Sequence, residues 1–159
     1  VSKYSSDLLP SEELIISIGD NKIRKQVATF IKHSFGFAIH HSALLGSGVF
    51  IDFGTVVMQG AIIQAYARIG KHVIVNTGAS VDHDCQVNDF VHISPHAALC
   101  GNVSVGEGTW IGAGTIVIPG VKIGSWCIIG AGSVVTKDIP DRVLAFGNPC
   151  KVVKQLSIP

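Results

Sequence analysis

Aliphatic side chains recur at every sixth residue from Leu45 to Val135, and this period is the strongest pattern in the chain. The members of the series are Leu45, Ile51, Val57, Ile63, Ile69, Val75, Val81, Val87, Ile93, Leu99, Val105, Ile111, Val117, Ile123, Ile129 and Val135. Four residues after each of them the side chain is usually small or β-branched. A period of six fits neither the 3.6-residue helix nor a long hairpin, but it fits a short strand and a turn repeated around a triangular coil. The sequence therefore predicts a parallel solenoid in which three hexapeptides close one coil.

The repeat also predicts where side chains lie relative to one another. Side chains eighteen residues apart are expected in one column, because one coil takes three hexapeptides. Glycines that follow many of the aliphatic residues, such as Gly46, Gly70 and Gly112, are expected at corners with no room for a side chain. The repeat makes about five coils, which at about 4.8 Å between strands form a prism on the order of 25 Å tall.

Two segments flank the repeat and complete the predicted organisation. Before it we expect a buried strand over 14–18, a tight turn over 19–21 and an amphipathic helix over 23–32. Such a β-turn-α unit either holds ligand groups at the helix start or only caps the prism. After the repeat we expect a short tail, helical in part, that closes the open end. The predicted parts are 1–38, 39–136 and 137–159.

Composition limits the classes of function. Apolar residues make up 47% of the 159 residues and charged residues 14%, which argues against disorder and coiled coil. The net charge of +1 lacks the cationic field that nucleic-acid binding needs. No apolar run reaches the roughly 20 residues of a membrane span, and the four cysteines show no disulfide pattern. We expect a cytoplasmic protein with reduced thiols.

One histidine stands out as a candidate for chemistry. His83 follows an inward aliphatic residue by two positions, so its side chain is expected to face outward. Gly101 lies eighteen residues later in the same column, where a backbone N–H can approach. An imidazole beside Asp84 and a bare glycine is a plausible general base next to an oxyanion donor, and an ordinary surface histidine is the alternative.

Several motifs are more specific than the repeat. The runs IVNTGASVDHDC over 74–85, DFVHI over 89–93, IGDNKIRK over 18–25 and IHHSA over 39–43 resemble the sugar-nucleotide N-acetyltransferases and sialic-acid O-acetyltransferases, which include the UDP-4-amino-sugar acetyltransferase of the bacillosamine pathway. The resemblance covers about 14–154. It implies an all-β fold, namely a left-handed parallel β-helix with a small β-α remnant of a Rossmann-like substrate domain before it. It also implies a homotrimer with active sites at subunit interfaces, acetyl-CoA as co-substrate and no metal.

The resemblance assigns roles to individual residues by position. His83 matches the catalytic base, Asp84 the neighbour that raises its basicity, and Asn76 a polar residue near the base. The amide of Gly101 matches the group that meets the thioester carbonyl. The positions that match acetyl-CoA contacts are His92, Gly101, Ala113 and Ala131. Those expected on the substrate side are Gly19, Asn21 and His40.

The implied reaction is the transfer of an acetyl group to the amine of a 4-amino-4,6-dideoxy sugar nucleotide, for surface glycan synthesis. Acetylation of a hydroxyl on a sialic acid or related sugar is the alternative within the family. A γ-type carbonic anhydrase, with zinc on His83, His92 and His96, and a non-catalytic trimeric β-helix are further alternatives. No glycine-rich first strand precedes Ser11, so either the chain is cut or its acceptor is smaller or held differently.

Overall fold

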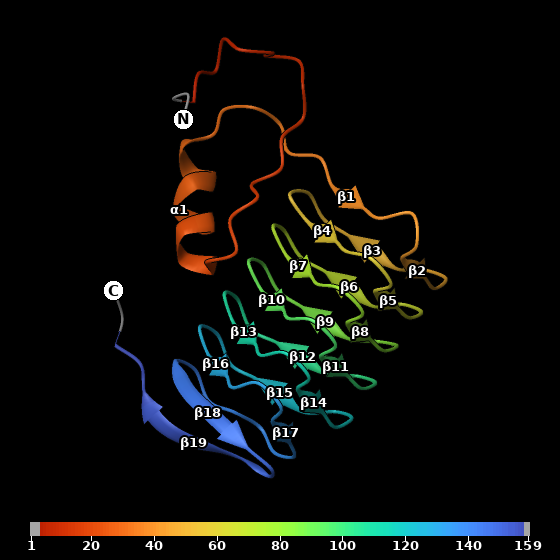
Figure 1. Ribbon diagram of the computed structural model, residues 1–159, viewed down its shortest axis with the longest axis vertical. Coiled ribbons are helices and arrows are strands. Elements are labelled where there is room, and N and C mark those ends of the chain that lie inside the picture. The colour runs from red at the N-terminus through yellow and green to blue at the C-terminus, as the bar shows by residue number, and fades with distance from the viewer. Residues whose placement is uncertain (1–3, 158–159) are drawn as a thin grey trace.

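The structure is a computed structural model that describes residues 4–157, and it forms a parallel β-solenoid with one helix beside it (Figure 1). Its strands make three sheets, which we call faces 1, 2 and 3. Face 1 contains β1 (Ala38–Ile39), β4 (Val56–Val57), β7 (Ile74–Val75), β10 (His92–Ile93), β13 (Trp110–Ile111), β16 (Ile128–Ile129), β18 (Val143–Gly147) and β19 (Cys150–Gln155). Face 2 contains β2 (Leu44–Leu45), β5 (Ile62–Ile63), β8 (Ser80–Val81), β11 (Ala98–Leu99), β14 (Ile116–Val117) and β17 (Val134–Val135). Face 3 contains β3 (Phe50–Ile51), β6 (Arg68–Ile69), β9 (Gln86–Val87), β12 (Ser104–Val105) and β15 (Lys122–Ile123).

The register of the strands confirms the predicted coil. Each strand of the repeat pairs in parallel with the strand eighteen residues later, as His92 does with Trp110 and Ser80 with Ala98. The solenoid has about six turns rather than five, because the first coil already begins at Ala38, whose strand pairs with β4. The chain turns between faces at three edges, which we call corner 1/2, corner 2/3 and corner 3/1 after the faces they join.

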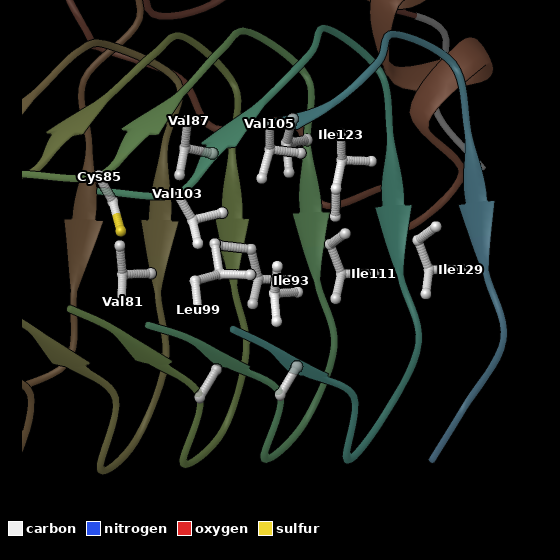
Figure 2. Close-up of a cluster of buried hydrophobic side chains, with 14 of the residues drawn as sticks. Val81, Cys85, Val87, Ile93, Leu99, Val103, Val105, Ile111, Ile123 and Ile129 are labelled. Atoms are coloured by element: carbon white, nitrogen blue, oxygen red, sulfur yellow. The ribbon is translucent and has the colours of Figure 1, made fainter. Parts of the chain in front are cut away.

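The predicted inward series forms the core. From Val57 to Val135 no member is more than 3% exposed, and Figure 2 shows these aliphatic side chains pointing into the prism from successive coils. The first two members differ, since Leu45 is 45% exposed and Ile51 is half-buried. Both belong to the first coil, and within residues 4–157 no coil precedes it to cover them.

The corners depend on two kinds of backbone position. A Cβ atom on Gly112 would lie 2.5 Å from the backbone nitrogen of Ala131, which confirms that such glycines leave no room for a side chain. A second series with the same period, absent from our prediction, has a left-handed backbone. It comprises Gly48, Gly54, Gly60, Tyr66, His72, Gly78, Asp84, Phe90, His96, Asn102, Gly108, Gly114, Gly120, Trp126 and Gly132. Non-glycine residues adopt this strained backbone conformation here because contacts with the neighbouring coils fix the backbone at every corner.

The segment before the prism differs from the prediction. Helix α1 spans Asn21–Phe30 and begins two residues early, because the Oδ1 atom of Asp20 accepts the backbone N–H of Ile23 at 2.9 Å and caps the helix. The predicted strand over 14–18 is wrong. Only Leu14 forms a bridge, to Phe35, and no strand among residues 4–157 pairs with 15–18. A strand needs a neighbour to satisfy its backbone groups, and the described segment supplies just that single bridge.

The end of the chain is extended rather than helical, so the predicted helical tail is wrong. Strand β18 pairs with β16 in parallel and places Val143 and Ala145 in the core. Strand β19 then turns back and pairs with β18 as an antiparallel hairpin (Figure 1). The unpaired edge of β16 explains the difference, since it provides backbone partners that an isolated tail helix would lack. Among residues 4–157 the structure has no helix that is long and apolar enough to cross a membrane.

Candidate active site

His83 lies at corner 2/3, between β8 and β9, with Asp84 directly after it. The left-handed backbone of Asp84, with φ of 58°, belongs to this turn, and its Oδ2 atom lies 2.8 Å from Nδ1 of His83. The backbone N–H of His83 donates to Oδ1 of Asp82 at 2.8 Å. The His83 side chain is 59% exposed, so the ring is held from one side and open to a ligand on the other.

The acidic neighbours determine the chemistry of this imidazole. The hydrogen bond to Asp84 raises the pKa of His83 above its ordinary value, and the charge of Asp82 raises it further. A carboxylate accepts, so Nδ1 carries the proton and Nε2 keeps its lone pair when the ring is neutral. The corner therefore presents a strengthened base whose free nitrogen faces away from Asp84.

Gly101 lies one coil further along the same column. A Cβ atom built on it would lie 2.6 Å from Nε2 of His83, so the imidazole occupies the space that a side chain would need. The carbonyl of Gly101 accepts the N–H of Gly120 at 3.0 Å, whereas no acceptor within residues 4–157 takes the N–H of Gly101 itself. A backbone donor that has no acceptor among the described residues therefore adjoins the base.

A second group surrounds His92 on face 1. Its Nδ1 atom lies 3.3 Å from the carbonyl oxygen of Gly19, and its Nε2 atom lies 3.1 Å from Nδ2 of Asn76. Because a carbonyl only accepts, these partners assign the proton to Nδ1 and the acceptor role to Nε2. Burial lowers the pKa of His92 and so favours the neutral ring. The Trp110 ring stacks on the imidazole with centroids 5.5 Å apart and planes at 1°.

Corner 1/2 continues from this group. Asn76 begins the corner, and its Oδ1 atom accepts the backbone N–H of Thr77 at 2.8 Å. Ala113 and Ala131 lie at the same corner, eighteen residues apart, and both are exposed. The glycines that follow them, Gly114 and Gly132, have open space where a Cβ atom would be. Small side chains therefore leave a narrow track along this edge.

A single chain does not bring all the predicted residues together. His83, Asp84 and Gly101 gather at corner 2/3, whereas Asn76 and His92 lie at corner 1/2 and on face 1. The imidazoles considered for zinc are likewise divided among these places. Among residues 4–157, no three histidine, cysteine or acidic side chains gather as a metal site.

The residues expected on the substrate side have separate surroundings. Gly19 is exposed and offers its carbonyl to His92. Asn21 is buried, and its Nδ2 atom donates to the carbonyls of Gly108 at 3.1 Å and Thr109 at 3.3 Å, so its side chain attaches α1 to the prism. Substrate binding by Asn21 stays a prediction.

His40 lies in the same column as Asn76, two coils earlier, at a distance of roughly 10 Å along the prism. Its Nδ1 atom lies 2.9 Å from the hydroxyl of Ser42, and its ring lies against that of His41 with centroids 4.3 Å apart. This places a half-buried imidazole and an exposed one on the edge that carries the small-residue track. A role for His40 in substrate binding stays a prediction.

Sequence analysis missed two polar residues around this site. Arg24 is 1% exposed and donates to the carbonyls of both Ile18 and Gly19. Ser94, in the column of Asn76, accepts the indole N–H of Trp110 at 2.7 Å and orients that ring. The signal available in the sequence was the spacing of Asn21 and Arg24, which are three residues apart and so share one face of a helix with few apolar residues.

A groove of about 870 Å³ runs between α1 and the last coils. Its lining includes Lys22, Lys25, Trp126, Arg142 and Leu156. The Lys25 ammonium pairs with Glu107 and lies 5.2 Å from the centre of the Trp126 ring, so it helps to hold α1 on corner 3/1. The groove shares Asn21 alone with the predicted site residues.

Comparisons with known proteins agree with this architecture. A family model described as bacterial transferase hexapeptide (six repeats) matches residues 102–137. The acetyltransferase domain of PglB from Neisseria gonorrhoeae, solved in complex with acetyl coenzyme A, is 40% identical with a TM-score of 0.86, over 89% of this chain and 70% of that one. PerB from Caulobacter crescentus, in complex with CoA and GDP-perosamine, is 44% identical with a TM-score of 0.88, over 90% of this chain and 70% of that one.

A comparison with curated proteins finds no match. A more distant structure, WeeI from Acinetobacter baumannii, is 24% identical with a TM-score of 0.87, over 96% of this chain and 74% of that one, and supports the fold alone. The chain is at least 40% identical to each of the two acetyltransferases and covers 70% of each of them. The chain belongs to the hexapeptide-repeat acyltransferases, in the group of sugar acetyltransferases.

Proposed function

We propose that this protein transfers the acetyl group of acetyl-CoA to the amine of an amino-sugar nucleotide, with His83 as the general base. The observation that carries the proposal is the arrangement at corner 2/3. There Nδ1 of His83 is bonded to Asp84, while Nε2 faces the space beside Gly101. PglB and PerB, the relatives that support the substrate classes, were solved with acetyl coenzyme A and with CoA and GDP-perosamine.

The proposed reaction needs no covalent intermediate on the enzyme. The amine nitrogen of the acceptor attacks the thioester carbon while Nε2 of His83 removes its proton. The N–H of Gly101 stabilises the oxyanion of the tetrahedral intermediate. The C–S bond then breaks, and the thiolate of coenzyme A leaves and takes the proton from the imidazolium. Asp84 keeps Nδ1 protonated throughout and stabilises the charged ring.

The small residues at corner 1/2 support binding of acetyl-CoA. Ala113 and Ala131, with the open glycines after them, fit a thin chain such as the pantetheine arm, because no side chain projects there beyond a methyl group. His92 and Asn76 supply polar atoms at the start of this track. In this proposal the track holds the co-substrate and corner 2/3 performs the chemistry.

The two corners complete one site only in an assembly, and we propose a homotrimer. Corner 1/2 and corner 2/3 are the two edges of face 2. The outward side chains of face 2 carry no charge, and Leu44 and Ile116 are 63% and 46% exposed. If three copies turn face 2 toward a threefold axis, corner 1/2 of one copy adjoins corner 2/3 of the next. The same packing removes apolar surface from water.

The function is tested by measuring thiol release from acetyl-CoA with UDP- and GDP-linked amino sugars and with free sialic acids as acceptors. We expect turnover with an amino-sugar nucleotide, and His83→Ala should lower it by about 10²- to 10⁴-fold without changing the melting temperature. Turnover with hydroxyl acceptors alone would indicate the O-acetyltransferase alternative. A His83→Ala variant with wild-type turnover would contradict the assignment of the base.

The shared site is tested by mixing two inactive variants. His83→Ala changes corner 2/3 and His92→Ala changes face 1 beside corner 1/2, so a mixed trimer contains a site that takes intact His83 from one copy and intact His92 from the next. Co-expression should therefore restore part of the activity, and light scattering should give three times the chain mass of 16.7 kDa. Absence of any restoration in mixed trimers would show that one chain supplies both corners.

A further inference from the structure

Arg24 is a buried cation that no carboxylate neutralises directly. It is 1% exposed, and none of the ion pairs among residues 4–157 includes it. Burial lowers the pKa of Arg24 to about 10, so the guanidinium stays charged at neutral pH. A buried charge is expensive unless its hydrogen bonds are satisfied, and such residues are retained where position is important.

Every hydrogen bond of this guanidinium goes to an oxygen of the protein. Nε donates to the carbonyl of His72 at 2.9 Å, and one terminal nitrogen donates to that of Phe90 at 3.0 Å and to Oδ1 of Asn21 at 2.8 Å. His72 and Phe90 occupy left-handed positions of successive coils at corner 3/1. The guanidinium has the shape of a fork, and this side of it therefore holds α1 against the rigid part of the prism.

The other side of the fork holds the segment before the helix. The remaining terminal nitrogen donates to the carbonyls of Ile18 at 2.9 Å and Gly19 at 3.1 Å. The Gly19 carbonyl is also the oxygen that lies 3.3 Å from Nδ1 of His92. One carbonyl thus joins the guanidinium to the imidazole, across a loop for which residues 4–157 provide no strand partner.

We propose that Arg24 is a positioning residue: by holding the Gly19 carbonyl against face 1, it keeps His92 in the Nδ1–H form with Nε2 as an acceptor toward Asn76. The link to acetyl-CoA rests on the proposed function, whereas the state of His92 does not. Without the guanidinium, the 3.3 Å contact with Nδ1 of His92 is the one side-chain tie that holds the Gly19 carbonyl at the prism among residues 4–157, so the carbonyl can move away and no longer selects one imidazole nitrogen. The burial of the ring and the charge of Arg24 act in the same direction by favouring neutral His92.

The experiment measures by NMR which of the two ring nitrogens of His92 carries the proton, in protein labelled with ¹⁵N-histidine. The variant His92→Asn is used to assign the signals. In the wild-type protein we expect a protonated Nδ1 and an unprotonated Nε2 at neutral pH. Arg24→Lys keeps the charge but lacks the planar fork that reaches both pairs of carbonyls. It should give mixed tautomers, and Arg24→Met should do the same or more.

Two controls separate positioning from general loosening. Asn21→Ala removes two hydrogen bonds between α1 and the prism and the one that Oδ1 accepts from Arg24, but it leaves the terminal nitrogen of Arg24 that donates to the Gly19 carbonyl. It should therefore lower the melting temperature while His92 stays in the Nδ1–H form. Arg68→Met removes an exposed arginine that lies over the Phe50 ring, and it should change neither the melting temperature nor the tautomer of His92. If Asn21→Ala and Arg24→Lys shift the tautomer equally, loosening of α1 explains the effect and the proposal is overturned.

Two other results would also overturn it, namely an Nε2–H form of His92 in the wild-type protein, or an unchanged tautomer in both Arg24 variants. An Nε2–H form in the wild-type protein overturns the proposal even if both variants fail to fold. In the kinetic assay, Arg24→Lys should raise KM for acetyl-CoA by about 10-fold or more with a smaller change in kcat, as for lost ground-state binding. A wild-type protein without acetyl transfer would refute the proposed function and leave the NMR test intact.

Discussion

A single methyl group at Gly101 tests the geometry of the proposed base. In Gly101→Ala the new Cβ atom would lie 2.6 Å from Nε2 and 2.7 Å from Cε1 of His83. Ordinary van der Waals contact begins near 3.4 Å, so the imidazole must retreat by roughly 1 Å. A displacement of about 1 Å in a reacting group lowers turnover by about 10²-fold. The hydrogen bond between His83 and Asp84 must also bend or break, which adds to the loss.

The same substitution should leave the fold intact. The backbone of Gly101 is outside the left-handed region, and the three atoms nearest to the added methyl all belong to the exposed His83 ring, which can move. Replacing glycine by alanine at a compatible position stabilises a protein by about 0.4–1 kcal/mol through the unfolded chain. We therefore expect a melting temperature equal to or above that of the wild-type protein, together with the large loss of turnover.

Gly106→Ala provides the matched control. There the added methyl would lie 2.5 Å from the backbone nitrogen of Ser125 and 2.6 Å from the carbonyl carbon of Gly124, and the backbone cannot move aside. Such overpacking costs about 1–3 kcal/mol, which lowers the melting temperature by about 2–4 °C per kcal/mol for a chain of this size. Calorimetry and the thiol-release assay should thus separate the two variants. Wild-type turnover in Gly101→Ala would refute the placement of the reacting nitrogen beside this glycine.

The remaining predictions concern pH, the core and the thiols. His83 must be neutral to act, and Asp84 raises its pKa, so kcat/KM should rise with pH to a midpoint above 6.5. Asp84→Asn should move that midpoint to lower pH, and an unmoved midpoint would show that Asp84 does not raise the pKa of the catalytic group. Ile111→Ala, in the fully buried column, should lower the free energy of unfolding by about 2–5 kcal/mol in urea titrations. Burial raises the pKa of the Cys85 thiol to about 11, so mass spectrometry should find Cys85 unmodified by iodoacetamide in the native protein at pH 8 and modified in urea, and rapid native labelling would contradict its burial.

The prism could be predicted from the sequence because its structure is periodic. Each hexapeptide places one aliphatic residue inward, so counting in steps of six and eighteen gives both burial and neighbours without any long-range information. That counting placed Gly101 beside His83 and put Ala113 and Ala131 in one column, and the structure has both arrangements. In a periodic fold, the number of residues between two positions determines where they lie relative to each other, whereas in most folds it does not.

The parts that failed are those in which the period stops. The strand expected over 14–18 depends on a partner strand, and the tail became β19 because the edge of β16 was available. Arg24 escaped notice because four of its five partners are backbone carbonyls, among them those of His72 and Phe90, and backbone oxygens leave no mark in a sequence. The left-handed series was hidden for a related reason, since residues as different as Tyr66 and Trp126 accept the same strained backbone.

The separation of the two corners explains why the residues of the proposed site do not meet within one chain. His83 lies at one edge of face 2 and His92 lies on face 1, beyond the other edge of face 2, because they are nine residues, or half a coil, apart. No side-chain motion within a rigid prism removes that separation. In the proposed trimer, apposition of neighbouring copies would remove it and would bury the uncharged row of face 2 in the same step. Assembly and catalysis would then depend on the same face, so a charge introduced at Ile116 should weaken both together.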